Sequence, residues 1–348
     1  MTLSGISRKS LALTRLKRFG GALVLACFAQ TANGQTVDPF YSGSYSITAL
    51  GSIMGVPPNY GGMIFKDANT LWVSGQATHI AGRYYSVPVT RGADCHIVSL
   101  GAGTVLGFGI FNDGGIAFGP GGVLFYSEYP GNSIGEVVPP NYSADFKTVA
   151  LTPLGVGASV GALNFVPAGY NGAGQFKVVS LDTDGFYTIP LTPDGIGGYD
   201  LGNATLATTL NTCASACGAE GFVYVPLGSP LFTSQSMLMA ELHTGTVGSY
   251  MIDANGNPVP ASRRNFITGL SNAQLAAMDP LTGDILFATF GLPNKVILVR
   301  GFGPGAPSGS MAHLAAQENW TTTFTLVNKG TSTAQLLCRC RSRFRKAT

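Results

Sequence analysis

Residues 115–128 read GIAFGPGGVLFYSE, and this stretch decides the fold. It holds two short apolar runs separated by Gly119-Pro120-Gly121-Gly122. Such a separator is typical of a tight turn, because glycine alone adopts positive φ without strain. Neither run shows the 3.6-residue apolar period of a helix. The stretch therefore predicts two antiparallel strands joined by a turn.

The first run of this stretch recurs along the chain. Each copy has apolar residues, usually after a glycine, and ends in Asp or Pro. The copies end at Asp67, Pro120, Pro167, Pro226 and Pro280, with a mean spacing of about 53 residues. Further strand-like runs follow each copy, with hairpin turn signals such as Asp-Gly and Asn-Gly between them. Four short strands per repeat is the pattern of a β-propeller blade.

The predicted fold is all-β, a five-bladed β-propeller over residues 35–300 closed by an N-terminal strand. The last repeat lacks a fourth strand of its own, whereas residues 45–51 resemble the fourth strand at residues 146–151. A ring closed in this way leaves no open sheet edge. Six blades are the alternative if one repeat is cryptic, and a multi-sheet β-sandwich is the rival architecture.

Composition and charge narrow the function classes. Glycine accounts for 48 of 348 residues, and 11% of residues are charged, against about 25% in ordinary proteins. The 45% hydrophobic content excludes a disordered chain, and the lack of a heptad or three-residue period excludes a coiled coil and collagen. The cations gather at the two termini, which leaves the middle of the chain acidic. A folded basic patch for nucleic acid is therefore not expected.

Residues 1–34 are predicted to be a signal peptide. Basic residues at 15–18 precede an apolar run at 19–29, and the small residues Ala32 and Gly34 mark a cleavage site. The run is too short to span a bilayer. A buried N-terminal helix and a lipid anchor on Cys27 are the alternatives. No later segment is apolar enough to be transmembrane, so we expect an exported, soluble, monomeric protein in the periplasm or outside the cell.

The end of the chain is predicted to hold a linker at 301–310 and an incomplete β-domain at 311–348. Residues 319–328 alternate as a strand should, and residues 334–337 begin a second strand, which together suggest a β-hairpin remnant. The basic tail that follows breaks this pattern. Truncation by a frameshift is one interpretation, and a genuine tail that binds an anionic surface is the other.

The blade sequence resembles a known class of propellers. Residues 115–128 match the blade opening of NHL-type and gluconolactonase-like (SMP-30-type) propellers, Gly-Ile-Ala-Phe-x-Pro-x-Gly followed by Leu-Tyr/Phe-x-x-Asp/Glu. Residues 279–287 are the second good match, and the general pattern extends over residues 40–300. Residues 313–322 resemble the start of a small β-domain appended to secreted bacterial proteins. Such a resemblance implies a fold, which unrelated functions share.

The lactonase-type members imply a metal site at the top of the channel, held by Glu, Asn and Asp. The positions before the five inner strands are Gly61, Gly114, Val160, Glu220 and Gln274, so only one is a carboxylate. The nearest candidates for this site are Glu220, Asp113 and Asn272. Their oxygen atoms suit a hard cation such as Ca²⁺, although the sequence requires no cofactor.

Two further groups have a binding or a purely structural interpretation. Asp253, Asn255 and Asn257 present three oxygen side chains at alternate positions and could hold a cation, whereas a hairpin loop is the simpler interpretation. Cys213 and Cys217 could form a small local disulfide in an oxidising compartment. Zinc is the rival interpretation for this pair, but no histidine lies close by in sequence.

The sequence favours a binding or scaffold module over an enzyme, because no set of catalytic residues is evident. The chain has only 17 Asp and Glu residues, 16 of them within the five predicted blades. The expected partner is an extracellular protein or a glycan. One alternative is a divergent metal-dependent lactonase- or esterase-like hydrolase. The other is a carbohydrate-binding propeller that uses tyrosines at its rims.

Overall fold

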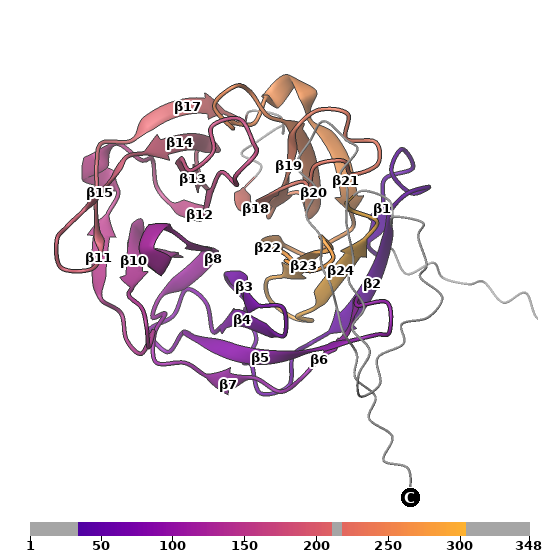
Figure 1. Cartoon of the computed structure of the whole chain (residues 1–348), viewed down its shortest axis with the longest axis horizontal. Coiled ribbons are helices and arrows are strands. Elements are labelled where there is room, and N and C mark those ends of the chain that lie inside the picture. Colours follow the sequence, from indigo (N-terminus) through magenta and orange to yellow (C-terminus); the bar gives the residue numbers. More distant parts are fainter. Residues whose placement is uncertain (1–33, 211–217, 304–348) are drawn as a thin grey trace, which may run out of the picture. The chain divides into compact units, whose positions relative to one another are not determined.

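The computed structural model describes residues 34–210 and 218–303. Over these residues the chain forms five antiparallel sheets of at least four strands each, arranged as a ring (Figure 1). This confirms the all-β, five-bladed propeller rather than the six-bladed alternative or the sandwich. The predicted signal peptide, most of the linker and the incomplete β-domain lie outside the described residues, as do Cys213 and Cys217.

The sheets follow one another along the chain, and each is numbered here as a blade. Blade I contains β3 (Met63–Asp67), β4 (Thr70–Gly75), β5 (Arg83–Arg91) and β6 (Ile97–Leu100), with β7 (Thr104–Val105) also paired to β5. Blade II contains β8 (Asn112–Phe118), β9 (Leu124–Glu128), β10 (Ser133–Val137) and β11 (Lys147–Ala150). Blade III contains β12 (Val160–Phe165), β13 (Phe176–Ser180), β14 (Gly185–Ile189) and β17 (Thr205–Thr209), and β15 (Leu191–Pro193) pairs with β16 (Tyr199–Leu201) as a separate hairpin.

The last two blades include strands from the start of the chain. Blade IV contains β18 (Ala219–Tyr224), β19 (Ser236–Glu241), β20 (Thr246–Met251) and β21 (Arg264–Thr268), with β1 (Thr36–Val37) at its outer edge. Blade V contains β22 (Ala273–Met278), β23 (Ile285–Thr289), β24 (Val296–Arg300) and β2 (Ser46–Gly51). Three short 3-10 turns complete the described elements: η1 (Pro120–Gly122), η2 (Thr152–Leu154) and η3 (Pro260–Ser262). No helix in the described part is long and apolar enough to cross a membrane.

The inner strands β3, β8, β12, β18 and β22 lie around the centre of the ring (Figure 1). Four of these strands have a glycine within them or directly before them, β22 being the exception, and it allows neighbouring inner strands to approach closely. A Cβ on Gly115 would lie 2.5 Å from the Leu163 amide nitrogen, and one on Gly221 would lie 2.5 Å from that of Ala276. Backbone atoms cannot move aside as a flexible side chain can. The glycine of the repeated sequence is therefore required by the packing of the inner strands around the axis.

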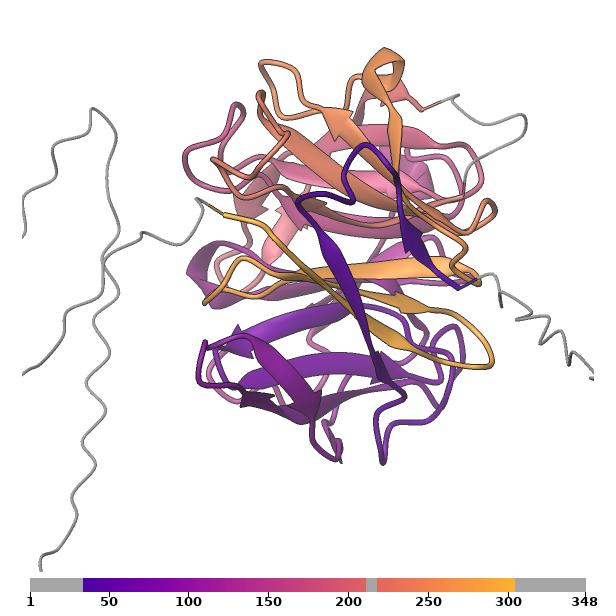
Figure 2. The ribbon, with the colours of Figure 1, turned by 90° about the vertical axis from the view of Figure 1, so that its right-hand side faces the viewer.

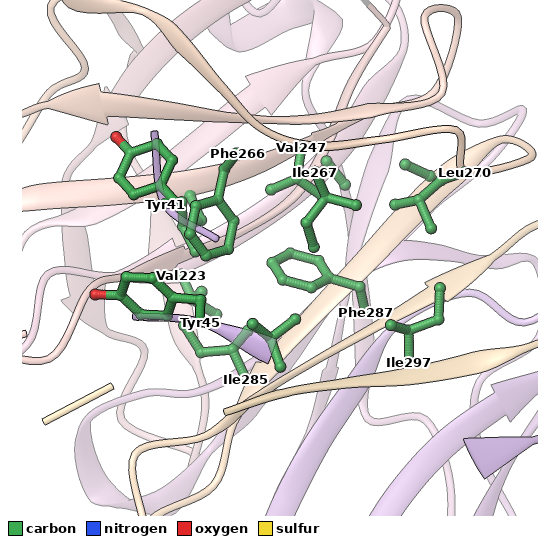
Figure 3. Close-up of a cluster of buried hydrophobic side chains, with 14 of the residues drawn as sticks. Tyr41, Tyr45, Val223, Val247, Phe266, Ile267, Leu270, Ile285, Phe287 and Ile297 are labelled. Carbon is green, nitrogen blue, oxygen red and sulfur yellow. The ribbon is translucent and has the colours of Figure 1, made fainter. Parts of the chain in front are cut away.

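The N-terminal segment closes the ring, as predicted, and also contacts a second blade. β2 pairs with β24 as the outer strand of blade V, and β1 pairs with β21 of blade IV. Between these strands, Tyr41 stacks on Phe232 at 5.3 Å between ring centroids, and the Tyr45 hydroxyl donates to the Pro230 carbonyl oxygen at 2.5 Å. Figure 2 shows this side of the ring, and Figure 3 shows both tyrosines in the apolar cluster between blades IV and V.

A buried ion pair joins blades V and I. Arg91 of β5 donates to both carboxylate oxygens of Asp279, at 2.6 and 2.8 Å. Close by, the His96 Nδ1 and Asp284 Oδ2 atoms are 2.5 Å apart. The side chains of Asp279 and Asp284 are fully buried, so each acid depends on its basic partner from the neighbouring blade.

Candidate functional site

A cavity of about 220 Å³ lies on the axis of the ring, at the end where the inner strands begin. All five blades contribute to it, which places it at the mouth of the channel. Its lining consists of Thr78, Asp113, Tyr129, Leu181, Glu220, Leu242, Gln274 and Phe290. We call this space the axial cavity. Two of the three residues predicted for the channel mouth, Asp113 and Glu220, line it.

The floor of the axial cavity is polar and is built at the starts of three inner strands. Asp113, Glu220 and Gln274 are each at most 2% exposed. Their strands β8, β18 and β22 all show a register shift at these positions. A β-bulge of this kind redirects a side chain out of the regular alternation. The bulges therefore explain how three polar side chains reach the axis from strands whose other residues are mainly apolar.

Tight contacts hold the three side chains together. The Gln274 Nε2 atom donates to Asp113 Oδ1 at 3.0 Å. A Cβ at Gly114 would collide with Glu220 Oε2, so the Glu220 carboxyl group lies directly against the backbone next to Asp113. Glycine at position 114 is thus what gives the Glu220 side chain its place on the floor.

Each of the three floor side chains has one oxygen without a hydrogen-bond partner. These atoms are Asp113 Oδ2, Glu220 Oε2 and Gln274 Oε1. Leaving a buried polar atom unpaired costs about 1–3 kcal/mol, so three such atoms in one cavity are a strong indication of a binding site. They supply up to three acceptor positions to whatever occupies the cavity.

Burial strongly alters the protonation of the two acids. Desolvation raises the pKa of Asp113 to about 7, although hydrogen bonds from Gly114 and Gln274 act in the opposite direction. Desolvation also raises the pKa of Glu220 well above its usual range, and the negative charges of Asp113 and Asp182 add to the effect. Asp113 is therefore close to its midpoint near neutral pH, and burial shifts Glu220 towards its protonated form. The pair carries less negative charge than two exposed carboxylates would, and the two acids titrate together.

The rim of the axial cavity is apolar. Tyr129, Leu181, Leu242 and Phe290 each follow directly after the second strand of their blade. The sequence could have revealed these rim residues, because the residue after the second strand occupies the same place in blades II to V, whereas blade I contributes Thr78 instead. Sequence reasoning missed them because it examined only the inner strands.

The structure brings together two of the three residues predicted for the channel mouth. Asp113 and Glu220 lie on the floor, whereas Asn272 is exposed. The Asn272 Nδ2 atom donates to the Phe290 carbonyl oxygen at 3.3 Å. Asn272 has a φ of 52°, so the chain turns in the left-handed region just before β22. The amide side chain on the floor is that of Gln274, two residues later, which the sequence reading noted but did not select.

The second predicted cation group forms a closed hairpin loop between β20 and β21. Asp253 Oδ1 accepts from the backbone amides of Asn255 and Asn257, at 2.8 and 2.9 Å. The Lys177 ammonium donates to Asn257 Oδ1 at 2.6 Å. The side-chain oxygens of Asp253 and Asn257 thus accept hydrogen bonds within the protein, as they would in a hairpin loop. In the part of the chain that the structure describes, no three His, Cys, Asp or Glu side chains group to hold a metal.

A larger hollow of about 470 Å³ lies beside blade IV and includes Phe40, Tyr41 and Phe232 in its lining. None of the buried unpaired polar atoms found in the described residues belongs to it. The axial cavity is the smaller space, but its unpaired oxygens make it the stronger candidate for a specific ligand.

Comparisons with known proteins add no function. No protein-family model matches the chain, and no curated protein matches its sequence. Among solved structures, an auxiliary nutrient binding protein from Bacteroides ovatus is similar at 10% identity, over 74% of this chain and 76% of that chain, with a TM-score of 0.41. Glutaminyl cyclase from Myxococcus xanthus is similar at 15% identity, over 74% and 97%, with a TM-score of 0.43.

A third similar structure is the PQQ-bound aldose sugar dehydrogenase from Streptomyces coelicolor. It shares 15% identity over 72% of this chain and 83% of that chain, with a TM-score of 0.37. At such identities and scores we draw no functional argument from these likenesses. The strand pairing described above establishes the fold, and the function must be argued from the axial cavity.

Proposed function

We propose that this propeller is a binding module whose axial cavity takes a small ligand with hydrogen-bond-donating groups. The observation that carries the proposal is the set of three buried, unpaired oxygens on the floor, on Asp113, Glu220 and Gln274. Hydroxyl or ammonium groups of a ligand would satisfy these acceptors. The apolar rim would cover the carbon skeleton of the same ligand.

The size and charge of the axial cavity define the ligand class. Its 220 Å³ is less than the roughly 300–1,000 Å³ of pockets for drug-sized molecules, which favours a ligand the size of one sugar or one amino acid. A floor of two buried acids whose negative charge is reduced by burial accepts neutral polyols and protonated amines but disfavours anions. Monosaccharides and amino sugars fit both requirements, in line with the carbohydrate-binding alternative.

A binding screen tests this proposal. Thermal unfolding of the wild-type protein is measured with monosaccharides, amino sugars and sugar acids at matched concentrations. A true ligand at 100 times its Kd stabilises the folded state by about 2.7 kcal/mol, which is several degrees in Tm for a domain of this size. We expect neutral or amino sugars to raise Tm and sugar acids to have no effect.

Variants of the floor show whether the axial cavity is responsible. Glu220→Gln keeps the side-chain volume but alters the acceptor pattern, and should reduce a ligand-induced shift in Tm. Asp182→Asn removes an exposed acid that acts on the floor only through its charge, and should leave most of the shift in place. If no sugar raises Tm, or if Glu220→Gln leaves the shift unchanged, the proposal is wrong.

A divalent cation is the second candidate occupant. The resemblance to lactonase-type propellers implies Ca²⁺ at the channel, and the chemistry of the floor fits it: Asp113, Glu220 and Gln274 would hold the cation through oxygen atoms, which hard cations prefer. When bound, such a cation would supply Lewis-acid polarisation of a carbonyl group, as the hydrolase alternative requires.

Calcium binding has a distinctive dependence on pH. Both acids must be deprotonated to hold the cation, so its binding releases protons and becomes stronger as the pH rises past 7. We expect any Ca²⁺-induced rise in Tm to grow from pH 6 to pH 8 and to disappear in Asp113→Asn. Metal-dependent turnover of lactones that is lost in Glu220→Ala would favour the hydrolase over the binding module.

The proposed site of action is outside the cytoplasm. This rests on the signal-peptide pattern at residues 1–34, and the partner would then be an extracellular glycan or protein. Expression in a bacterial host with N-terminal sequencing of the exported protein tests it. A mature chain that begins near Gln35 would support the proposal, whereas an uncleaved cytoplasmic chain would contradict it.

A further inference from the structure

A cluster of three aromatic rings surrounds one lysine at the junction of blades I and II. Lys66 lies near the end of β3, and its Nζ atom is 5.2 Å from the ring centroid of Trp72, 4.8 Å from that of Phe118 and 4.2 Å from that of Tyr142. All three distances are within the roughly 6 Å at which a cation is attracted to a ring face. One ammonium group is therefore shared by three rings.

The three rings form the walls of a cage. The centroids of Trp72 and Phe118 are 5.8 Å apart, those of Trp72 and Tyr142 5.4 Å, and those of Phe118 and Tyr142 5.8 Å. The planes of these pairs meet at 51°, 72° and 78°. Rings that only packed against one another would not need to face a common point, whereas these three all face the Lys66 ammonium. We call Trp72, Phe118 and Tyr142 the aromatic cage.

Two walls of the cage are buried and the third, Phe118 at the end of β8, is half-buried. Trp72 is 6% exposed and Tyr142 is 8% exposed. The Tyr142 hydroxyl donates to the Gly122 carbonyl oxygen at 2.7 Å, which sets the orientation of the ring. The cage is thus preorganised, so a ligand would not have to order it on binding.

The Lys66 ammonium, which lies against these rings, is in contrast held only weakly. Lys66 is an exposed residue. Within residues 34–210 and 218–303, its Nζ atom makes no hydrogen bond or salt bridge, so the rings are its only partners. A primary ammonium is strongly hydrated and flexible on its four-carbon stem. An alkylated ammonium loses less hydration on entering an aromatic cage, so it is the better occupant of the same space.

The aromatic cage is separate from the axial cavity. Asp113 lies near the start of β8 and Phe118 at its end, five residues further on. At about 3.3 Å per residue, these positions are about 16 Å apart along the strand. The cage is therefore near the opposite end of the inner strands, and the two sites share no residue.

We propose that Trp72, Phe118 and Tyr142 form a recognition site for a quaternary ammonium group and that the Lys66 ammonium is its displaceable occupant. The ligand cation enters the cage as the Lys66 side chain moves into solvent. The rings select for positive charge, because their faces carry the negative part of the ring quadrupole. The class of ligand is a small organic cation such as a choline-like molecule.

The fluorescence of Trp72 reports directly on the cage. The chain has two tryptophans, and Trp320→Phe leaves Trp72 as the only one. This full-length variant is titrated with tetramethylammonium chloride, against sodium chloride at the same ionic strength. We expect a saturable change in Trp72 emission with the organic cation alone.

The occupant is tested by changing Lys66. In Lys66→Ala no internal cation competes, so tetramethylammonium should bind about tenfold more tightly than in the parent. Lys66→Arg keeps a cation against the rings and should bind as weakly as the parent. Equal affinity in all three proteins, or no saturable binding in Lys66→Ala, would overturn the proposal.

Charge selectivity is tested with a matched pair of probes. Choline and its neutral analogue 3,3-dimethylbutan-1-ol have nearly the same shape. We expect choline to bind Lys66→Ala and the alcohol to bind at least tenfold more weakly. If the alcohol binds equally well, the space is an apolar hollow rather than a cation site and the proposal fails. A further Phe118→Leu change in this background should weaken choline binding, and an unchanged affinity would also contradict the proposal.

Discussion

Removal of the Arg91 guanidinium should destabilise the ring more than any surface change at the same blade junction. In Arg91→Ala the buried Asp279 carboxylate loses both of its bonds to Arg91. The Arg91 bonds to the Ala68 and Cys95 carbonyl oxygens are lost as well. Breaking a buried ion pair by removing one partner costs about 3–5 kcal/mol.

The structure places the expected cost at the lower end of this range. Asp279 keeps two other donors, the Leu281 amide at 3.0 Å and the Thr282 hydroxyl at 2.6 Å. We therefore expect a loss of about 3 kcal/mol in the free energy of unfolding. For a domain of this size, that loss lowers Tm by about 6–12 °C.

Urea unfolding followed by tryptophan fluorescence measures this cost, and the same junction offers a control. Arg300 also spans blades V and I, but it is partly exposed and its Nη1 atom lies 3.8 Å from an exposed carboxylate, that of Asp94. Its Nη2 atom also donates to the Ile97 carbonyl oxygen at 2.7 Å, so Arg300→Ala should cost about 1–2 kcal/mol. The double variant Arg91→Met with Asp279→Asn buries no unpaired charge and should recover part of the loss. If Arg91→Ala costs no more than Arg300→Ala, or the double variant is the least stable of the set, the reasoning is refuted.

Three further outcomes follow from the structure. The pKa of Asp113 is raised to about 7 in the folded protein, so between pH 4 and 7 the folded state binds more protons than the unfolded state, and the free energy of unfolding should fall as the pH rises. In urea titrations Asp113→Asn should reduce this dependence on pH. The same dependence in the variant and the wild type would contradict the prediction. Burial lowers the pKa of Lys177 to about 8, so its contribution to stability should instead rise between pH 8 and 10, and Lys177→Met should remove this rise. Gly115→Ala should lower the free energy of unfolding by more than about 3 kcal/mol or prevent folding. Gly43→Ala, which has open space around the added Cβ, should stay within about 0.5 kcal/mol of wild type. Similar Tm values for the two variants would contradict this prediction.

The sequence was sufficient for the architecture because each blade repeats the same requirements. Gly115 and Gly221 recur where neighbouring backbones meet, and turn residues recur between strands. The closing strand was also predictable, since residues 45–51 fill the place of the missing fourth strand in the last repeat. These features depend on local pattern and on periodicity, which a sequence displays directly.

The arrangement of the candidate site was only partly predictable. Strand alternation assigns side chains to faces, but a register shift occurs at the start of the inner strands that carry Asp113, Glu220 and Gln274. A bulge adds a residue and moves the following side chains to the other face. The positive φ of Asn272 adds a further turn. For this reason spacing alone could not distinguish Gln274, on the floor of the axial cavity, from Asn272 outside it.

The closing strand has a consequence for the order of events during folding. Ser46 pairs with Arg300, more than 250 positions later in the chain, so blade V cannot be completed until nearly the whole described chain has been synthesised. Contacts between such distant residues form slowly, because the loop between them must first be closed. Until then β24 presents a free edge of unpaired amides and carbonyls, to which a strand from another molecule can add. Dilute conditions during refolding should therefore favour the monomer, and crowded ones should favour exchange of the first strand between neighbouring chains.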